Sequence, residues 1–190
     1  MHQYKRAIIA HIGPMFGGKT SGLLADIRKM RIAKYHVALF KPIMDDRYSN
    51  DEVVNHDGEK IKASNVYDFY SIYLYAREHK DVNVIAIDEF QFLDTKKMSV
   101  KEFVNFIIKN GLTLLFSGLD LDSDLQPFNN VKEILPYSTY IFKHKAVCVC
   151  CGNDAIVSFC KVNKDGQNLV GGSDTYEPRC LKCYLKDHKL

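Results

Sequence analysis

No apolar stretch in this chain approaches the roughly 20 residues that a helix needs to cross a membrane, so a helical membrane protein is excluded. The first residues contain neither the apolar segment nor the small-residue cleavage site of a secretory signal. Charge of one sign is also scarce, because 26 Lys and Arg face 23 Asp and Glu and leave a net charge of +3. Nucleic-acid-binding domains usually concentrate more positive charge on one face. We therefore expect a soluble, cytoplasmic protein with neither a membrane nor a nucleic acid as partner.

The composition is that of a folded domain with a substantial core. Of the 190 residues, 46% are hydrophobic and 26% are charged, which suits one main domain with a small appendage. No internal repeat or low-complexity segment is present. The six cysteines, in a reducing compartment, suggest metal ligands before disulfides.

Apolar patterning predicts strands that alternate with helices. The run 7–12 is continuously apolar, as in a strand buried on both faces, and apolar residues at helical spacing follow from Lys19. A second amphipathic helix ends at Gly111. Further strands are expected over 37–40, 82–87, 112–116 and 140–142, helices over 67–79 and 100–108, and a polar loop over 45–58.

This alternation implies βαβ units and a mostly parallel sheet flanked by helices. Ligands in such sheets bind at the carboxyl ends of the strands. From residue 147 onward, cysteines, glycines and short strand-like pieces replace the alternation. We therefore predict an α/β nucleotide-binding domain over residues 1–145 and a zinc-binding domain over residues 146–190.

The segment 13–20 has the spacing of a P-loop, with Gly13, four residues, Gly18, Lys19 and Thr20. Such a loop surrounds a polyphosphate with backbone N–H groups, while the lysine supplies a charge and the threonine hydroxyl meets Mg²⁺. The alternative is a strand, a glycine turn and a helix without a ligand. The predicted ATP-binding residues of the loop are Gly13, Pro14, Met15, Phe16, Gly17, Gly18, Lys19 and Thr20.

Two adjacent carboxylates, Asp88 and Glu89, follow the strand predicted over 82–87. Downstream of a P-loop, an acidic residue at a strand end normally serves the magnesium ion, although Asp also forms turns. Its neighbour points to another side and could accept a proton from a hydroxyl that attacks phosphorus. We assign Asp88, with Thr20, to Mg²⁺ and Glu89 to catalysis, with a solvated surface glutamate as the alternative.

Two Cys-x-x-Cys pairs, Cys148 with Cys151 and Cys180 with Cys183, have the spacing of a tetrahedral zinc site. Four protein ligands leave no open position, so the zinc is expected to be structural and to clamp the loop between the pairs. Cys150 is a competing ligand, but its spacing to Cys151 is not that of a zinc-binding pair. Cys160 is expected to be a small core residue.

Two further sets of residues could contact a ligand. Arg47, in the polar segment Asp45-Asp46-Arg47-Tyr48, could reach phosphate oxygens, although a solvated loop explains it equally well. Apolar groups in loops could line a base pocket. The candidates are Met15, Phe16, Phe90, Phe92, Leu119, Phe128 and Tyr176.

Together these pieces resemble the thymidine kinase family that carries a zinc-bearing lasso, the cellular, bacterial and poxviral type. The likeness covers residues 6–185. It is carried by the stretches GPMFGGKT (13–20), DDRYS (45–49), IDEFQF (87–92), PF (127–128), AVCVCC (146–151) and GGSDTYEPRCLKC (171–183).

The resemblance implies a RecA-like P-loop fold and ATP-dependent 5′-phosphorylation of thymidine and deoxyuridine in nucleoside salvage. It implies Glu89 as the general base, Asp88 on Mg²⁺, Arg47 on the phosphates, a homotetramer, and feedback inhibition by thymidine triphosphate. The positions that match the family's thymine pocket are Met15, Phe92, Leu119, Phe128, Leu169 and Tyr176. Three positions depart from the family pattern: Ser123 replaces a phenylalanine, Phe90 a small residue and Asn129 a common glycine.

Other classes of function remain open at this point. They are a zinc-containing P-loop ATPase that acts on nucleic acid, a nucleotide-sensing module without turnover, and a nucleoside monophosphate kinase with a zinc lid. The short chain and mild charge count against the first, and the C-terminal position of the cysteine pairs counts against the last.

Overall fold

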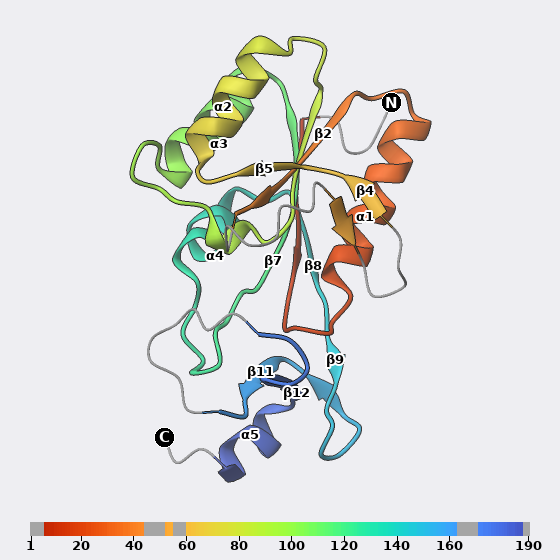
Figure 1. Ribbon diagram of the computed structural model, residues 1–190, viewed down its shortest axis with the longest axis vertical. Coiled ribbons are helices and arrows are strands. Elements are labelled where there is room, and N and C mark those ends of the chain that lie inside the picture. The colour runs from red at the N-terminus through yellow and green to blue at the C-terminus, as the bar shows by residue number, and fades with distance from the viewer. Residues whose placement is uncertain (1–5, 44–51, 55–59, 163–170, 188–190) are drawn as a thin grey trace.

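The computed structural model describes residues 6–43, 52–54, 60–162 and 171–187. Within these, six parallel strands form one sheet in the order β5-β2-β6-β7-β1-β8 (Figure 1). The elements, in chain order, are β1 (Ile8–Ile12), α1 (Lys19–Ile32), β2 (Val37–Pro42), β3 (Glu52–Val54), β4 (Lys60–Lys62), β5 (Ser64–Val66), α2 (Phe69–Glu78), β6 (Val84–Ile87), the 3₁₀ turn η1 (Phe90–Phe92), α3 (Val100–Lys109), β7 (Thr113–Gly118), α4 (Asn129–Ile134), the 3₁₀ turn η2 (Leu135–Tyr137), β8 (Tyr140–Lys143), β9 (Ala146–Val147), β10 (Asp154–Ala155), β11 (Val157–Cys160), β12 (Tyr176–Arg179) and α5 (Leu181–Asp187).

The sheet lies between two helical layers. Alternate strand residues face opposite sides, so Ile9 packs with α1 while Ile8 and Ala10 pack with α2, α3 and α4. Figure 1 shows α1 on one side of the sheet and the α2–α3 pair on the other. Both faces are covered, which explains why the central strands read as continuous apolar runs rather than as alternating ones.

Local signals explain where the helices begin and end. Ser99 and Glu102 form a reciprocal capping box at the start of α3, and this satisfies backbone donors that the first turn leaves free. Gly111 follows with φ +63°, a left-handed conformation that glycine adopts without strain. The Asp68 side chain caps α2 by accepting from the Ser71 amide.

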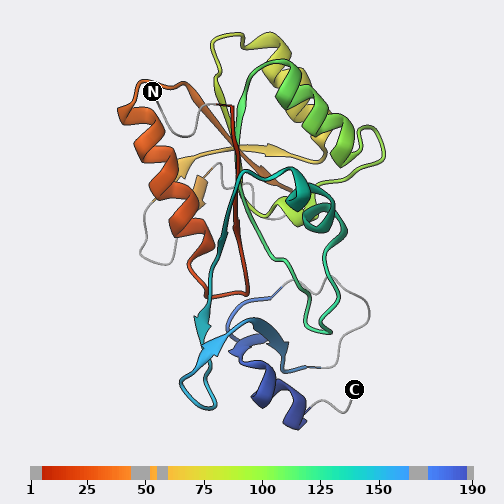
Figure 2. The same cartoon turned by 180° about the vertical axis from the view of Figure 1, so that it is seen from behind.

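A smaller C-terminal region follows the sheet. β8 ends at Lys143 and β9 begins at Ala146, after which β9 pairs with β10 and β11 pairs with β12, both antiparallel. Figure 2 shows this region, with α5, beyond the end of the sheet where β1 leads into α1.

The predicted α/β architecture with a mostly parallel sheet is confirmed, with local corrections. The loop expected over 45–58 is wrong at Glu52–Val54, which forms β3 and pairs with β4; the rest of that span lies outside the described residues. The strand expected over 82–87 begins at Val84. Among the residues described, no helix is both long and apolar enough to cross a membrane.

Gly22 lies inside α1, where glycine costs about 1 kcal/mol relative to alanine, and packing explains its presence. A Cβ atom at Gly22 would lie 2.5 Å from Nδ1 of His11, a buried residue of β1. The imidazole therefore occupies the space that a methyl group would need.

We expect Gly22→Ala to destabilise the fold by about 1–2 kcal/mol, since overpacking outweighs the gain in helix propensity. Chemical denaturation measures the free energy of unfolding. In a His11→Ala background the same substitution should become neutral or stabilising. An increase in stability from Gly22→Ala alone would contradict the packing argument.

Candidate active site

The segment 13–18 joins the buried strand β1 to the N-terminus of α1. Gly13, Phe16 and Gly18 have φ of +138°, +64° and +82°, so the loop folds back on itself before α1 starts at Lys19. The first turn of α1 contains no acidic residue, and nothing lies within 4 Å of a Cβ built on Gly18. Free N–H groups at a helix N-terminus, together with the helix dipole, favour a bound anion. The geometry is that of a phosphate-binding loop.

The Lys19 ammonium lies inside this loop. Its Nζ donates to the carbonyl oxygen of Pro14 at 2.8 Å, and the residue is buried. Burial lowers the pKa of Lys19, while the carboxylates of Glu89, Asp88 and Asp120 act in the opposite direction. The Lys19 ammonium is thus surrounded by carboxylates. A polyphosphate bound there with a divalent cation would have Lys19 as its cationic partner.

Thr20 and Asp88 meet although 68 residues separate them. The Thr20 hydroxyl donates to both carboxylate oxygens of Asp88, at 3.2 and 3.4 Å, and Ser117 donates to the same carboxylate. Burial and then the neighbouring Glu89 raise the pKa of Asp88 to about 6, against these hydrogen bonds and Lys19. A hydroxyl and a carboxylate are hard oxygen ligands of the kind that Mg²⁺ prefers, so these residues fit that ion.

Glu89 lies at a sharp bend two residues after the end of β6. Its backbone is left-handed, with φ 53° and ψ 44°, a conformation uncommon for a non-glycine residue and concentrated at functional sites. The Gln91 amide donates to Glu89 Oε2 at 2.5 Å and accepts from the Leu119 amide at 3.1 Å. Gln91 therefore fixes the carboxylate relative to the end of β7.

A cavity of about 450 Å³ connects the loop with Glu89 and with the segment after residue 170. Its lining residues are Met15, Phe16, Gly18, Lys19, Thr20, Ser21, Glu89, Gly172 and Ser173. The parallel strands β1 and β6 both end here, separated by β7. One cavity is therefore lined by Lys19, Thr20 and the Glu89 carboxylate.

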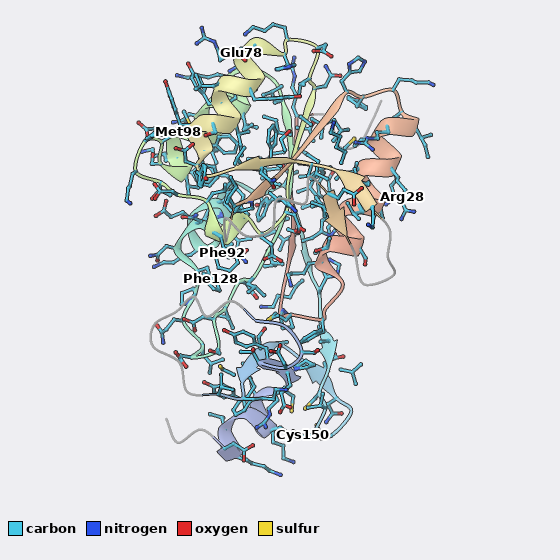
Figure 3. All side chains as sticks on the ribbon, in the orientation of Figure 1. Arg28, Glu78, Phe92, Met98, Phe128 and Cys150 are labelled. Carbon is cyan, nitrogen blue, oxygen red and sulfur yellow. The ribbon has the colours of Figure 1, made fainter. Side chains whose placement is uncertain are left out.

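The predicted pocket residues fall into two groups. Met15 lines the cavity, whereas Phe92 and Phe128 form an edge-to-face pair at 5.9 Å between centroids (Figure 3). Leu119 packs with Phe92 against the core on the α3 side of the sheet. Tyr176 is buried at the start of β12, and burial, then Cys160, Asp124 and Asp122, raise its pKa. Arg47 and Leu169 lie outside the described residues.

Two of the three departing residues, Phe90 and Ser123, are buried. Phe90 is fully buried against Phe69 and Phe116; the expectation that it lies in a loop near the cleft is wrong, because it starts η1 and fills the core. Ser123 is buried, with its Oγ unpaired among the described residues, and its carbonyl accepts from the Tyr184 hydroxyl at 2.9 Å.

The four predicted metal ligands, Cys148, Cys151, Cys180 and Cys183, converge on one point. All their sulfur atoms lie within 4.8 Å of one another. Zinc–sulfur bonds of about 2.3 Å in a tetrahedron imply sulfur separations of about 3.8 Å, and Cys151 and Cys180 are 3.7 Å apart. This arrangement fits a structural zinc ion.

The other two cysteines lie apart from this cluster. Cys150 is exposed, and among the described cysteines it does not belong to the four-sulfur group. Cys160, expected in the core, is only half-buried, and its sulfur donates to the Val162 carbonyl at 3.2 Å. The four sulfur atoms of the two Cys-x-x-Cys pairs therefore form a cluster that does not include Cys150.

The cysteine region contacts the phosphate-binding loop directly. Phe16 packs against the cluster that contains Cys148 and Cys183. The Met15 amide donates to the Ser158 hydroxyl of β11 at 2.9 Å. The four-cysteine fold therefore supports the loop from outside the sheet.

Sequence reasoning missed three residues that shape the site. Ser117 and Gln91 contact the two carboxylates, and Asp120 pairs with Lys143 close to Lys19. Ser117 and Asp120 flank the end of β7, which the sheet order places between β1 and β6. Their position at the end of a predicted strand could have identified Ser117 and Asp120, because parallel strands end at a common edge of the sheet, where ligands bind.

Comparison with known proteins agrees with this geometry. The family model described as Thymidine kinase matches residues 6–184. A curated protein named Thymidine kinase from Bacteroides thetaiotaomicron is 35% identical over 175 residues, which are 92% of this chain and 84% of the relative. The match spans both the α/β sheet and the four-cysteine region, and the chain belongs to the thymidine kinase family.

Proposed function

We propose that this protein transfers the γ-phosphoryl group of ATP to the 5′-hydroxyl of thymidine, and of deoxyuridine, for nucleoside salvage. Family membership supports the reaction. The single structural observation that carries it is the cavity shared by Lys19, Thr20 and Glu89. A phosphate-binding loop and an acidic side chain in one cavity are what phosphoryl transfer to a hydroxyl needs.

In the proposed step, the Glu89 carboxylate accepts the proton of the 5′-hydroxyl. The oxygen attacks the γ-phosphorus, the bond between that phosphorus and its bridging oxygen breaks, and ADP leaves with the electron pair. Gln91 holds Glu89 by a hydrogen bond at 2.5 Å, which reduces the motion that would separate base and hydroxyl. Positioning and electrostatic stabilisation supply most of the catalysis in such reactions.

The triphosphate is proposed to bind along residues 13–20, with backbone amides and Lys19 as donors. Thr20 and Asp88 would hold Mg²⁺, which would neutralise the charge that develops on the phosphates. Arg47 is proposed to contact the phosphates. The left-handed turn at Gly18 and the open space around it support close approach of a phosphate.

The thymine pocket is proposed to lie beside the cavity. Its residues would be Met15, Phe92, Leu119, Phe128, Leu169 and Tyr176. The edge-to-face contact of Phe92 with Phe128 gives a rigid apolar surface, which suits a flat base. Ser123 would leave one wall smaller than a phenylalanine would, and this bears on nucleoside preference.

Family membership also supports a homotetramer, inhibition by thymidine triphosphate and a cytoplasmic location, which we propose here. We propose a division into residues 1–145, which bind nucleotide, and residues 146–190, which bind zinc. The latter would act as a clamp on the lasso that precedes Cys180.

Labelled ATP incubated with a panel of nucleosides, thymidylate and single-stranded DNA tests the function. We expect label on thymidine and deoxyuridine, because the cavity contains both a phosphate-binding loop and a carboxylate. Label on thymidylate alone would indicate a monophosphate kinase. Hydrolysis stimulated by DNA in a salt-sensitive manner would indicate a nucleic-acid ATPase. ATP binding without turnover would indicate a sensor.

Glu89→Gln should lower kcat by about 100-fold or more while ATP affinity stays near that of the wild type, because the amide cannot accept the proton. Steady-state kinetics and ATP titration measure the two quantities. Glu133→Gln, an exposed change on α4, is the matched control. Turnover near the wild-type value would remove Glu89 from the role of base.

Cys151→Ser should lose the bound metal, whereas Cys150→Ser should retain about one zinc per chain, since only the first residue belongs to the four-sulfur cluster. Metal content by atomic absorption distinguishes them. Loss of the cluster should also raise the KM for ATP, because Phe16 packs against it. Equal zinc content in the two variants would contradict the assignment.

A further inference from the structure

The cavity beside the phosphate-binding loop has a second wall, which comes from the C-terminal region. Gly172 and Ser173 line the cavity together with Lys19 and Glu89. Both residues belong to the short segment 171–175, which leads into β12. The phosphate-binding loop therefore forms only part of the surface that a bound triphosphate would meet.

This segment folds into a compact turn. The amides of Thr175 and Tyr176 both donate to the Gly172 carbonyl, at 3.1 and 2.9 Å. The Gly172 amide donates to Oδ1 of Asp174 at 3.1 Å. A Cβ atom at Gly171 would lie 2.3 Å from Oγ1 of Thr175, so a side chain has no room at that position. The turn therefore has a defined shape at the edge of the cavity.

Lys161, which directly follows β11, binds the turn at two points. Its amide donates to the Thr175 carbonyl at 2.9 Å, and its ammonium Nζ donates to the Ser173 carbonyl at 2.7 Å. The same strand, β11, carries Ser158, whose hydroxyl accepts from the Met15 amide of the phosphate-binding loop. Both walls of the cavity are therefore attached to β11, which fixes one relative to the other.

These bonds leave the turn with donors, rather than acceptors, for a ligand. The carbonyl groups of Gly172, Ser173 and Thr175 all accept hydrogen bonds within the C-terminal region. Ser173 is exposed, and its amide and hydroxyl have no partner among the residues that the structure describes. A phosphate group offers strong acceptor oxygens. The second wall is therefore suited to a phosphate.

The charges near the turn and the position of Glu89 indicate which phosphate would lie there. Lys19 lines the cavity, and the Lys161 ammonium contacts Ser173. The carboxylate of Asp174 already accepts a backbone amide of its own turn. Because Glu89 must reach the hydroxyl that attacks the γ-phosphorus, the cavity that it lines would hold the γ-phosphoryl group.

We propose that the Ser173 hydroxyl donates a hydrogen bond to the γ-phosphoryl group of ATP, and that Lys161 positions Ser173 for this contact. The proposal rests on the proposed function, since it concerns the same ATP site. Lys161 is a positioning residue, because it acts through the Ser173 carbonyl. The γ-phosphoryl group is then held from both walls, by Lys19 and the loop amides on one and by Ser173 on the other. Donors fixed in place before the reaction stabilise charge effectively.

Equilibrium binding of ATP and of ADP, each with magnesium and without nucleoside, tests the contact in the full zinc-loaded chain. Ser173→Ala should weaken ATP binding by about tenfold, the scale of one hydrogen bond to a charged group. ADP lacks the γ-phosphoryl group, so its affinity should stay near that of the wild type. Ser173→Thr keeps the hydroxyl and should bind ATP within about twofold of the wild type.

Variants of Lys161 test its positioning role. Lys161→Met removes the ammonium that holds the Ser173 carbonyl and should weaken ATP binding by about threefold to tenfold, again without an effect on ADP. Lys161→Arg can still donate to that carbonyl and should restore the affinity. In a Ser173→Ala background, Lys161→Met should cause no further loss, because the lysine acts through Ser173.

The matched control is Lys186→Met, which removes an exposed lysine from α5 in the same C-terminal region. It should leave the affinities for both nucleotides unchanged. Unchanged ATP affinity in Ser173→Ala would overturn the proposal, as would equal losses for ATP and ADP. A loss of thymidine affinity without a loss of ATP affinity would assign Ser173 to the nucleoside and would also overturn it. Additive losses in the double variant would remove Lys161 from the positioning role.

The wild type separates failure of this proposal from failure of the proposed function. A wild type that transfers label to thymidine, beside a Ser173→Ala variant that binds ATP normally, refutes the contact alone. A wild type that binds no ATP refutes the proposed function and the contact together. Zinc content and thermal melting show whether each variant keeps the fold. If Ser173→Ala does not, Ser173→Gly takes its place in the same comparison of ATP with ADP.

Discussion

The hydrogen bond between Thr20 and Asp88 is the interaction on which the rest of the site depends. It joins the N-terminus of α1 to the end of β6 across the intervening strand β7. Because Asp88 is held there, the bend at Glu89 directs the next carboxylate into the cavity beside the phosphate-binding loop. A parallel sheet produces this arrangement without additional elements, because its strands end at a common edge.

The loop is supported from two further directions. The four-cysteine region contacts it through Phe16 and Ser158, and His144 packs against it, since a Cβ at Gly13 would lie 2.4 Å from the His144 carbonyl oxygen. Backbone amides bind phosphate well only when their directions are fixed. Packing contacts, hydrogen bonds and the glycine within α1, Gly22, therefore all help to hold the peptide groups of the loop in place.

Much of this could be predicted from the sequence, and the reasons for success and failure are physical. Buried parallel strands, the glycine-rich turn and the cysteine pairs are local patterns with a fixed spacing, so they were visible. Phe90 was misplaced because an aromatic residue next to a motif can face the core as readily as the cavity. Gln91, Ser117 and His144 make contacts with distant segments of the chain, which no local pattern encodes. β3 was not predicted because it lies within the polar span 45–58. It is a short strand stabilised by its pairing with β4.

The central claim is that one cavity brings a triphosphate held by backbone amides to a sugar hydroxyl whose proton Glu89 accepts. A crystal structure of the chain with thymidine and a non-hydrolysable ATP analogue tests it most directly. The account predicts a Glu89 carboxylate oxygen within about 2.6–3.2 Å of the 5′-oxygen, or joined to it by one water. A carboxylate far from that oxygen, with no water between them, would contradict it.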